Sequence, residues 1–351
     1  MLSVKKLRKR PRQFVRFTGL SVEQFDQLLF ELEPVYRQRQ TQRLNRAGRR
    51  RELGAGHPFR LPLADRLLAT LLYLRLYVSG ALLGYLFNLD ESSLSRERNL
   101  RMLPALLEVL PVPMQDHLLS AVEQPDEKQP DEKQPSQGRK KRGKRIGTLK
   151  ELLEAYPEFE ELWLDGTEQE VPKPQDKQQR KQRFSGKHKC HTLKTQVVTA
   201  RTSHTSHTSH TSQTSEGATG RNVIVHTFGG LPGSLHDHVL LRASGVVAQV
   251  PKERIVRLDR GYEGVEKEYP DARLVKAKRA RRNHPLNLLE RYHNRALNKL
   301  RMPVEHSLGQ LKKFAVLSGI YRGPVKQYEG IFDCVAGLHN FRSLGRLSWD
   351  A

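Results

Sequence analysis

Two aspartates stand where apolar stretches of the sequence give way to glycine. Asp165 follows the apolar residues 162–164 in ELWLDGTE, and Asp259 ends the run RIVRLD before Arg260 and Gly261. We expect each run to be a strand that ends on its carboxylate, because the glycine lets the backbone turn sharply. Ligands of α/β sheets gather beyond the carboxyl ends of strands, so the two carboxylates would meet there. The competing interpretation is that Asp165 merely begins a hairpin turn.

Two neighbouring carboxylates predict a site for a hard divalent cation. Without a cation they would repel each other, and the pKa of one of them would rise. Mg²⁺ relieves this repulsion, and it is typically held by one or two carboxylates together with phosphate oxygens. Two such ions, roughly 3.5–4 Å apart, could activate a nucleophile and stabilise a leaving oxygen. The chemistry indicated is phosphoryl transfer with two Mg²⁺ ions, for which Mn²⁺ would substitute.

A third carboxylate is expected from a helix beside the sheet, and Glu305 is the best candidate. It lies in the helical segment 294–317, with Arg301 four residues before it and Lys312 seven residues after it. On a continuous helix these three side chains would share one face. Pro303 either opens this helix or kinks it. The alternative is that Glu305 is an ordinary exposed helix residue.

A fourth acid, Asp237, competes with Asp259 for the role of second metal ligand. It lies in GSLHDHVLL, at the start of a helix expected over residues 234–250. A short acid at a helix start commonly caps backbone N–H groups, and this favours Asp259 as the ligand. Asp237 and His236 are therefore expected beside the metal ligands rather than among them. A purely structural hydrogen bond is an equally open role for His236.

Six short motifs occur in one order along the chain: DGTE, FSGKHKCHTLK, GSLHDHVLL, LDRGYEG, RMPVEHSLGQLKKF and LHNFR. They resemble those of DDE-class insertion-sequence transposases, and more narrowly the IS-five-type branch, which is similar to Harbinger-type nucleases. The resemblance covers roughly residues 60 to 343. It implies an RNase H-like domain in which Asp165, Asp259 and Glu305 are the catalytic, metal-binding acids. It also implies that Arg301 and Lys312 contact element-end DNA.

A leucine-rich block at residues 61–110 is expected to form a helix, a second helix, a turn and a third helix. The third helix would open at Glu91 or Ser92 and carry a polar first turn. Helix-turn-helix proteins read base edges from this part of their recognition helix. The candidate DNA-binding residues are Ser92, Ser93, Ser95, Arg96, Arg98 and Asn99. A plain helical bundle with a solvated face is the alternative, and the basic charge of the chain favours DNA binding. The block also resembles the N-terminal helix-turn-helix domain of the same transposases.

The remaining pattern predicts an α/β fold with an RNase H-like mixed sheet flanked by helices, preceded by an all-helical domain. We expect a helical DNA-binding domain at 1–120, a disordered basic linker at 121–148 and a catalytic domain at 149–345. The first domain would begin with a basic arm, followed by a helix that a capping box at Ser21 and Gln24 opens. A Ser-His-Thr repeat at 202–216 is expected to be a mobile hairpin tip, with metal binding as the minor alternative.

The charge balance points to a polyanionic partner. Lys and Arg number 61 against 38 Asp and Glu, which gives a net charge of +23. Phosphate neutralisation explains such an excess, so DNA is the expected partner. No apolar run approaches the roughly 20 residues that span a bilayer, so no membrane partner is expected. Two cysteines without framework spacing fit a reducing cytoplasm, where the protein would associate with the bacterial nucleoid.

These features predict a transposase that binds the inverted-repeat ends of its element, as a possible homodimer, and joins them to target DNA. Two hypotheses compete with it. One is a transposase-derived protein, such as a repressor, that binds DNA without cleaving it. The other is a nuclease adopted by its host, with the same acids but without strand transfer.

Overall fold

The computed structural model describes residues 1–45, 59–115, 146–202, 220–259, 261–280, 285–300 and 302–349. The predictions for linker residues 121–145, for repeat residues 203–216 and for Arg301 concern residues outside this described part. Within it, the helices α1 to α8 precede the sheet in sequence, and the remaining helices alternate with its strands or follow them.

A mixed sheet forms the centre of the second half of the chain, as predicted. Its main strands stand in the order β4–β3–β1–β5–β6. The strand β3 pairs antiparallel with β1 and β4, whereas β5 runs parallel to both β1 and β6. A short strand that was not predicted, β2, pairs with β3. The strands are β1 (Glu161–Glu170), β2 (Phe184–Ser185), β3 (Cys190–Arg201), β4 (Asn222–Pro232), β5 (Ile255–Leu258) and β6 (Arg273–Lys276).

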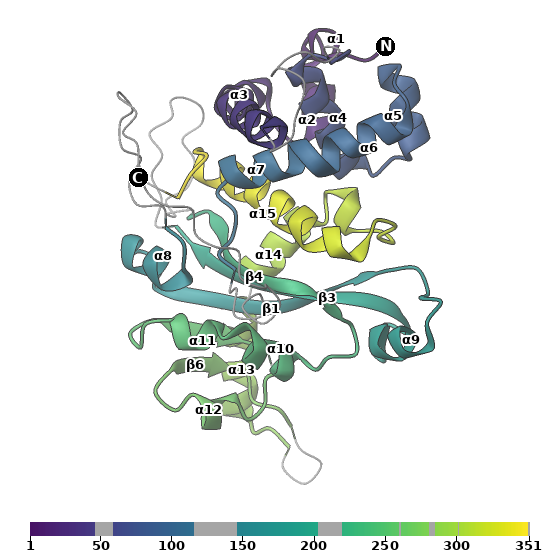
Figure 1. Cartoon of the computed structure of the whole chain (residues 1–351). Helices are drawn as coiled ribbons and strands as arrows, with labels where there is room; N and C mark the ends of the chain where they lie inside the picture. Colours follow the sequence, from purple (N-terminus) through teal and green to yellow (C-terminus); the bar gives the residue numbers. More distant parts are fainter. Residues whose placement is uncertain are drawn as a thin grey trace.

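Each face of the sheet carries its own apolar core because side chains alternate along a strand. Leu162 and Leu164 of β1 belong to the core formed with α8 (Leu149–Ala155), α10 (Asp237–Ser244) and α11 (Val246–Gln249). We call this the α10 face. Val197 of β3 belongs to the core formed with α14 (Met302–Leu311) and α15 (Tyr328–Leu344), which is the α14 face. In Figure 1, α15 lies between the sheet and the N-terminal helices.

The N-terminal helices begin earlier than predicted, and the expected basic arm is wrong. Residues 4–18 form two short helices because Val4, Leu7 and Phe14 are buried against the following helices. The capping box at Ser21 and Gln24 is confirmed at the start of α3. The helices are α1 (Val4–Arg8), α2 (Pro11–Thr18), α3 (Val22–Leu44), α4 (Leu63–Leu76), α5 (Gly80–Phe87), α6 (Glu91–Glu97), the π-helical η1 (Arg98–Met102) and α7 (Leu103–Val109).

A buried charged network joins four of these N-terminal segments. Glu97 at the end of α6 accepts from Arg66 of α4 at 3.1 Å, from Arg101 of η1 at 2.8 Å and from the Tyr36 hydroxyl of α3 at 2.7 Å. Only 7% of the Glu97 side chain is exposed, so its charge depends on these partners. The network fixes how α3, α4 and α6 lie against one another.

The N-terminal helices share one core with the α14 face of the sheet. The apolar residues of α1 to α7 join those of α15 in a single cluster. Tyr77 at the end of α4 also stacks on Tyr321, and its hydroxyl accepts a hydrogen bond of 2.6 Å from the Arg322 backbone. Trp349, beyond the predicted end of the catalytic domain, packs on Tyr156. The two regions therefore form one continuous packed unit.

The other helices are short or lie at the periphery of the fold. They are α9 (Lys177–Arg183), α12 (Val265–Glu268), α13 (Leu288–Leu300), and the 3₁₀ turns η3 (Ala315–Leu317) and η4 (Val325–Gln327). Cys190 and Cys334 are both free, as expected. No helix in the described ranges is long and apolar enough to span a membrane.

Candidate functional site

Asp165 lies inside β1 rather than at its end, and both sequence interpretations of Asp165 and Gly166 are therefore wrong. The strand runs on to Glu170, and its pairing with β3 continues over that whole length. Gly166 is not among the glycines with positive φ, so it makes no turn. The pairing of β1 with β5 stops earlier, at Trp163 and Arg257. Asp165 thus lies two residues beyond the last residue of β1 that pairs with β5, while its pairing with β3 continues.

Asp259 directly follows β5, as predicted. The last pair of the parallel strands is Trp163 with Arg257, and Asp165 and Asp259 each lie two residues beyond it. Neighbouring strands lie about 4.8 Å apart, and residues in parallel register point to the same face. Both aspartates are partly buried, and Asp165 Oδ1 accepts a hydrogen bond of 2.8 Å from the Gly166 amide.

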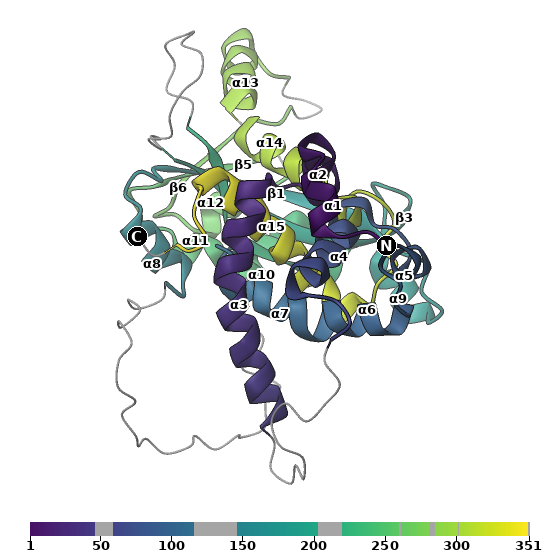
Figure 2. The ribbon, with the colours of Figure 1, turned by 90° about the horizontal axis from the view of Figure 1, so that it is seen from above.

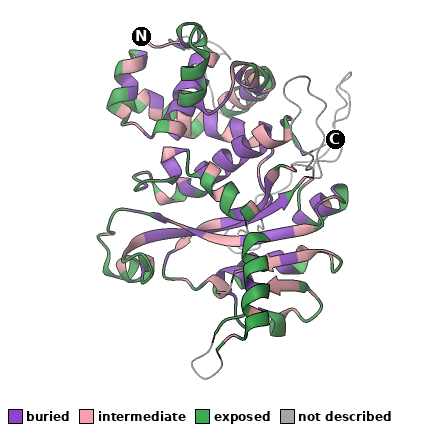
Figure 3. Cartoon of the chain, turned by 180° about the vertical axis from the view of Figure 1, so that it is seen from behind, coloured by how far each residue is buried: buried purple, intermediate pink, exposed green. Residues whose placement is uncertain are grey.

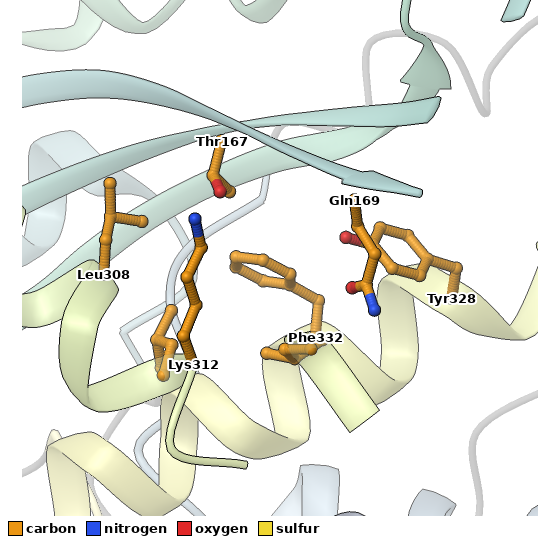
Figure 4. Close-up of a pocket in the computed structure, with 8 residues that line it drawn as sticks. Thr167, Gln169, Leu308, Lys312, Tyr328 and Phe332 are labelled. Atoms are coloured by element: carbon orange, nitrogen blue, oxygen red, sulfur yellow. The ribbon is translucent and has the colours of Figure 1, made fainter. Parts of the chain in front are cut away.

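The helix α14 lies along β1 on the face to which Asp165 points. Asp165 shares this face with Trp163 and Thr167, because side chains alternate along the strand. Trp163 lines a groove together with Pro303 near the start of α14. Thr167 lines a small cavity with Lys312, whose side chain reaches towards the strand (Figure 4). The helix therefore runs past Asp165 between these two points.

Glu305 lies in the first turn of α14 and is exposed. It shares this turn with Pro303, which lines the groove with Trp163, and is two residues away from it in sequence. The predicted long helix is in fact two helices, α13 and α14, and α14 begins at Met302. Pro303 thus belongs to the first turn of a new helix, where a proline costs no hydrogen bond.

The donor set suits a hard divalent cation, although it is not a closed metal cluster. In the part of the chain that the structure describes, no three His, Cys, Asp or Glu side chains are gathered so as to hold a metal ion. Asp165 of β1 and Asp259, which directly follows β5, are the two carboxylates that would hold such an ion. Such a pair is sufficient for Mg²⁺, which usually completes its shell with water and substrate phosphate.

Asp237 lies on the opposite face of the sheet from Asp165. Its carboxylate accepts from Lys194 at 2.7 Å, and Lys194 also lies 3.8 Å from Glu168. A Cβ atom added at Gly166 would lie 3.2 Å from one oxygen of Asp237, and one added at Gly261 would lie 3.3 Å from the other. These two glycines therefore make room for a carboxylate, which the sequence did not reveal.

The start of α10 is confirmed near Asp237, but the capping residue is different from the one expected. His236 is the N-cap, and its Nδ1 accepts from the His238 amide at 3.3 Å. Asp237 is the first residue of the helix, and the partner of its carboxylate is Lys194 of β3. The ion pair between Lys194 and Asp237 joins α10 to the sheet directly behind Asp165.

The candidate DNA-binding residues of α6 and η1 divide into two groups. Ser92 and Arg96 are exposed, and Asp90 caps the helix by accepting from the Ser93 amide at 2.9 Å. Arg98 instead lies over the Tyr73 ring at 3.5 Å, and burial lowers the pKa of its guanidinium. A separate set of contacts holds Ser95, Arg98 and Asn99 to one another.

The fold and the site define a helix-turn-helix unit joined to a mixed α/β unit with paired strand carboxylates. The chain belongs to the DDE superfamily endonuclease family, whose model matches residues 164–220 and 200–340. The model for the helix-turn-helix of DDE superfamily endonuclease matches residues 59–100.

One relative extends this comparison. The chain is 30% identical over 195 residues to the "Probable transposase for insertion sequence element IS702" of Microchaete diplosiphon. The aligned part is 55% of this chain and 60% of that relative. No solved structure matches the chain significantly.

Proposed function

We propose that the protein is a DNA transposase that binds the inverted-repeat ends of its element, cleaves them and joins them to target DNA. The observation that supports this proposal is the parallel pairing of β1 with β5, because Asp165 and Asp259 each lie two residues beyond its last pair, Trp163 and Arg257. The sheet order supports an RNase H-like fold, because three antiparallel strands are followed by two that run parallel to β1. The name of the relative also supports the biological role.

In this proposal Asp165, Asp259 and Glu305 hold two Mg²⁺ ions, for which Mn²⁺ substitutes. Divalent cations bound there would polarise a phosphate oxygen and lower the pKa of a bound water. Lys312 lies close to Thr167 on the same face, where its ammonium group would contact a DNA phosphate. We assign Arg301 the same kind of role from the family resemblance.

The chemistry proceeds in two displacements at phosphorus. A water oxygen attacks the scissile phosphate, the bond to the 3′ oxygen breaks, and a 3′-hydroxyl and a 5′-phosphate result. The 3′-hydroxyl then attacks a phosphodiester of the target, and one new bond replaces one broken bond. The acids Asp165, Asp259 and Glu305 orient the scissile phosphate on the α14 face. No covalent bond between protein and DNA is needed.

Asp237 and Lys194 support the site from the α10 face without binding the metal. Their ion pair lies against Gly166 and Gly261, which neighbour the two aspartates in sequence. Residues 1–120 would bind DNA through the exposed part of α6, and residues 149–345 would carry the chemistry. The protein would act in the bacterial cytoplasm at the nucleoid, as a homodimer assembled on two element ends.

The test is metal-dependent nicking of a duplex that carries the inverted repeat flanking the reading frame. Asp165→Asn, Asp259→Asn and Glu305→Gln should each lower the nicking rate by at least about a hundredfold. Asp271→Asn is the matched control, because this aspartate is 74% exposed and pairs only with Lys252 in the described structure. Full activity in any of the three variants would remove that residue from the site.

Two outcomes of the same assay separate the competing hypotheses. If Asp237→Asn abolishes nicking while Asp259→Asn does not, Asp237 is the second ligand. A protein that binds the duplex but never nicks it, with any divalent metal, is a DNA-binding derivative. Joining of the nicked end to a second duplex distinguishes a transposase from a nuclease adopted by its host.

A further inference from the structure

The helix α13 stands away from the rest of the fold. Figure 2 shows it extending beyond the sheet and the helices that cover it, and it is exposed along much of its length in Figure 3. Only Asn294 and Leu297 of its described side chains are buried. A helix that hides so little apolar surface gains little stability from packing, so its exposed face is available for another purpose.

A basic stripe covers the exposed side of α13. Arg291, Arg295 and Lys299 are spaced by four residues, and all three are exposed. At this spacing successive side chains lie along one side of a helix. The single acid of the helix, Glu290, bonds to Lys278 at 3.0 Å. The stripe therefore presents an excess of positive charge to solvent.

An aromatic side chain stands beside this stripe. Tyr292 follows Arg291 and is 75% exposed. Arginine, lysine and exposed tyrosine are the side chains that contact phosphate and sugar in nucleic-acid complexes. The composition of this surface thus suits a polyanion better than it suits an apolar partner.

The stripe leads directly to the proposed catalytic face. Lys299 and Leu300, at the end of α13, line a groove of about 910 Å³ together with Trp163 of β1 and His306 of α14. The buried indole nitrogen of Trp163 has no hydrogen-bond partner within the described structure. A DNA strand that reaches Asp165 from this side would therefore pass along α13.

We propose that α13 is a docking helix for duplex DNA, which binds the phosphate backbone next to the scissile bond. The inference rests on the proposed function and names the surface that holds the flanking DNA. Arg291, Arg295 and Lys299 supply the phosphate contacts, and they would do so without regard to base sequence. A helix of 13 residues is about 20 Å long, enough to follow several phosphates.

The test measures affinity for a duplex of arbitrary sequence, without divalent metal, as a function of salt. The triple variant Arg291→Gln, Arg295→Gln and Lys299→Gln should bind at least about tenfold more weakly at moderate salt. The slope of log affinity against log salt should become shallower by as much as about 2.7, because each phosphate contact contributes about 0.9 to the slope and three contacts are removed.

The matched control removes the same charge elsewhere. Lys150, Lys252 and Lys267 are exposed residues outside α13, and their replacement by glutamine should change the slope by less than half as much. Equal losses in both triple variants would show only a general effect of net charge and would overturn the proposal.

A second variant tests whether a second copy of the chain, instead of DNA, occupies this surface. Leu288 and Leu289 are 82% and 80% exposed, so α13 would instead contact a second copy of the chain if it were a dimer interface. The proposal is overturned if Leu288→Ser with Leu289→Ser dissociates a dimer in sedimentation while the charge variant binds DNA normally. This test measures DNA binding without divalent metal and no cleavage. A negative result here therefore leaves the roles proposed for Asp165 and Asp259 untouched, because the nicking assay tests those roles.

Discussion

At the scale of single residues, the glycines beside the two aspartates have a different purpose from the one that the sequence suggested. The motif DGTE led us to expect a turn at Gly166. The structure keeps that residue in an extended strand and places Asp237 against it from the α10 face. The sequence predicted a strand before each of the two aspartates, and both strands are present, although β1 continues past Asp165. The contact with Asp237 depends on α10 packing on the sheet, and no local pattern encodes it.

Gly166→Ala should disturb the ion pair behind the site. The added methyl group would lie 3.2 Å from Asp237 Oδ1, so the carboxylate must move away or the strand must shift. We expect a loss of about 1 kcal/mol in the free energy of unfolding and a reduced nicking rate. Gly186→Ala is the control, since its Cβ would meet no atom within 4 Å. Equal stability of the two variants in urea unfolding would refute this explanation.

At the scale of elements, sequence patterns predicted the mixed sheet and the helix after Ser21, and both are present. They missed features that tertiary contacts decide, and the single helix expected over 294–317 is two helices, α13 and α14. The extension of β1 beyond Asp165 was not expected, because its partner β3 stabilises it from a distance in sequence. The segment of α1 and α2 was expected to be a basic arm. Its few apolar residues become buried only by packing against α3 and α4, which the local sequence does not show.

Glu97→Ala should destabilise the N-terminal helices strongly. It would leave Arg66, whose side chain is only 10% exposed, without its carboxylate partner. Removing one member of a buried pair costs about 3–5 kcal/mol, and we expect a loss near the lower end. Glu108→Ala is the control, because its pair with Arg39 is 32% and 42% exposed, and exposed pairs contribute about 1 kcal/mol or less. Chemical unfolding that gave similar losses for both variants would contradict the role assigned to Glu97.

At the scale of the whole molecule, the helical region and the sheet share one core, and a buried acid lies between them. Asp333 of α15 accepts a hydrogen bond of 2.7 Å from Thr227 of β4 and another from the Gln115 side chain. Burial raises the pKa of Asp333 to about 8. Nothing in the sequence analysis singled out Asp333, because only the docking of α15 on the sheet buries it.

The raised pKa of Asp333 makes stability depend on pH. The folded protein keeps this proton up to about pH 8, whereas the unfolded chain releases it near its ordinary pKa of about 3.9. Between these values the folded state binds more protons, so the contribution of Asp333 to stability falls as pH rises, by up to about 1.4 kcal/mol per pH unit.

Asp333→Asn should remove this dependence. The wild type should lose stability relative to the variant as pH rises from about 4 to about 8. Unfolding free energies measured across this range would show the difference growing. A constant difference between the two proteins would mean that Asp333 is already charged in the folded state.

The central claim of the account is that Asp165 and Asp259 hold a divalent cation together on the α14 face. The most direct measurement is anomalous scattering from crystals of the protein bound to duplex DNA and soaked with Mn²⁺. The account predicts a peak about 2.0–2.3 Å from carboxylate oxygens of both aspartates. A peak beside Asp237 and Glu168 on the α10 face, or no peak near Asp165, would contradict it.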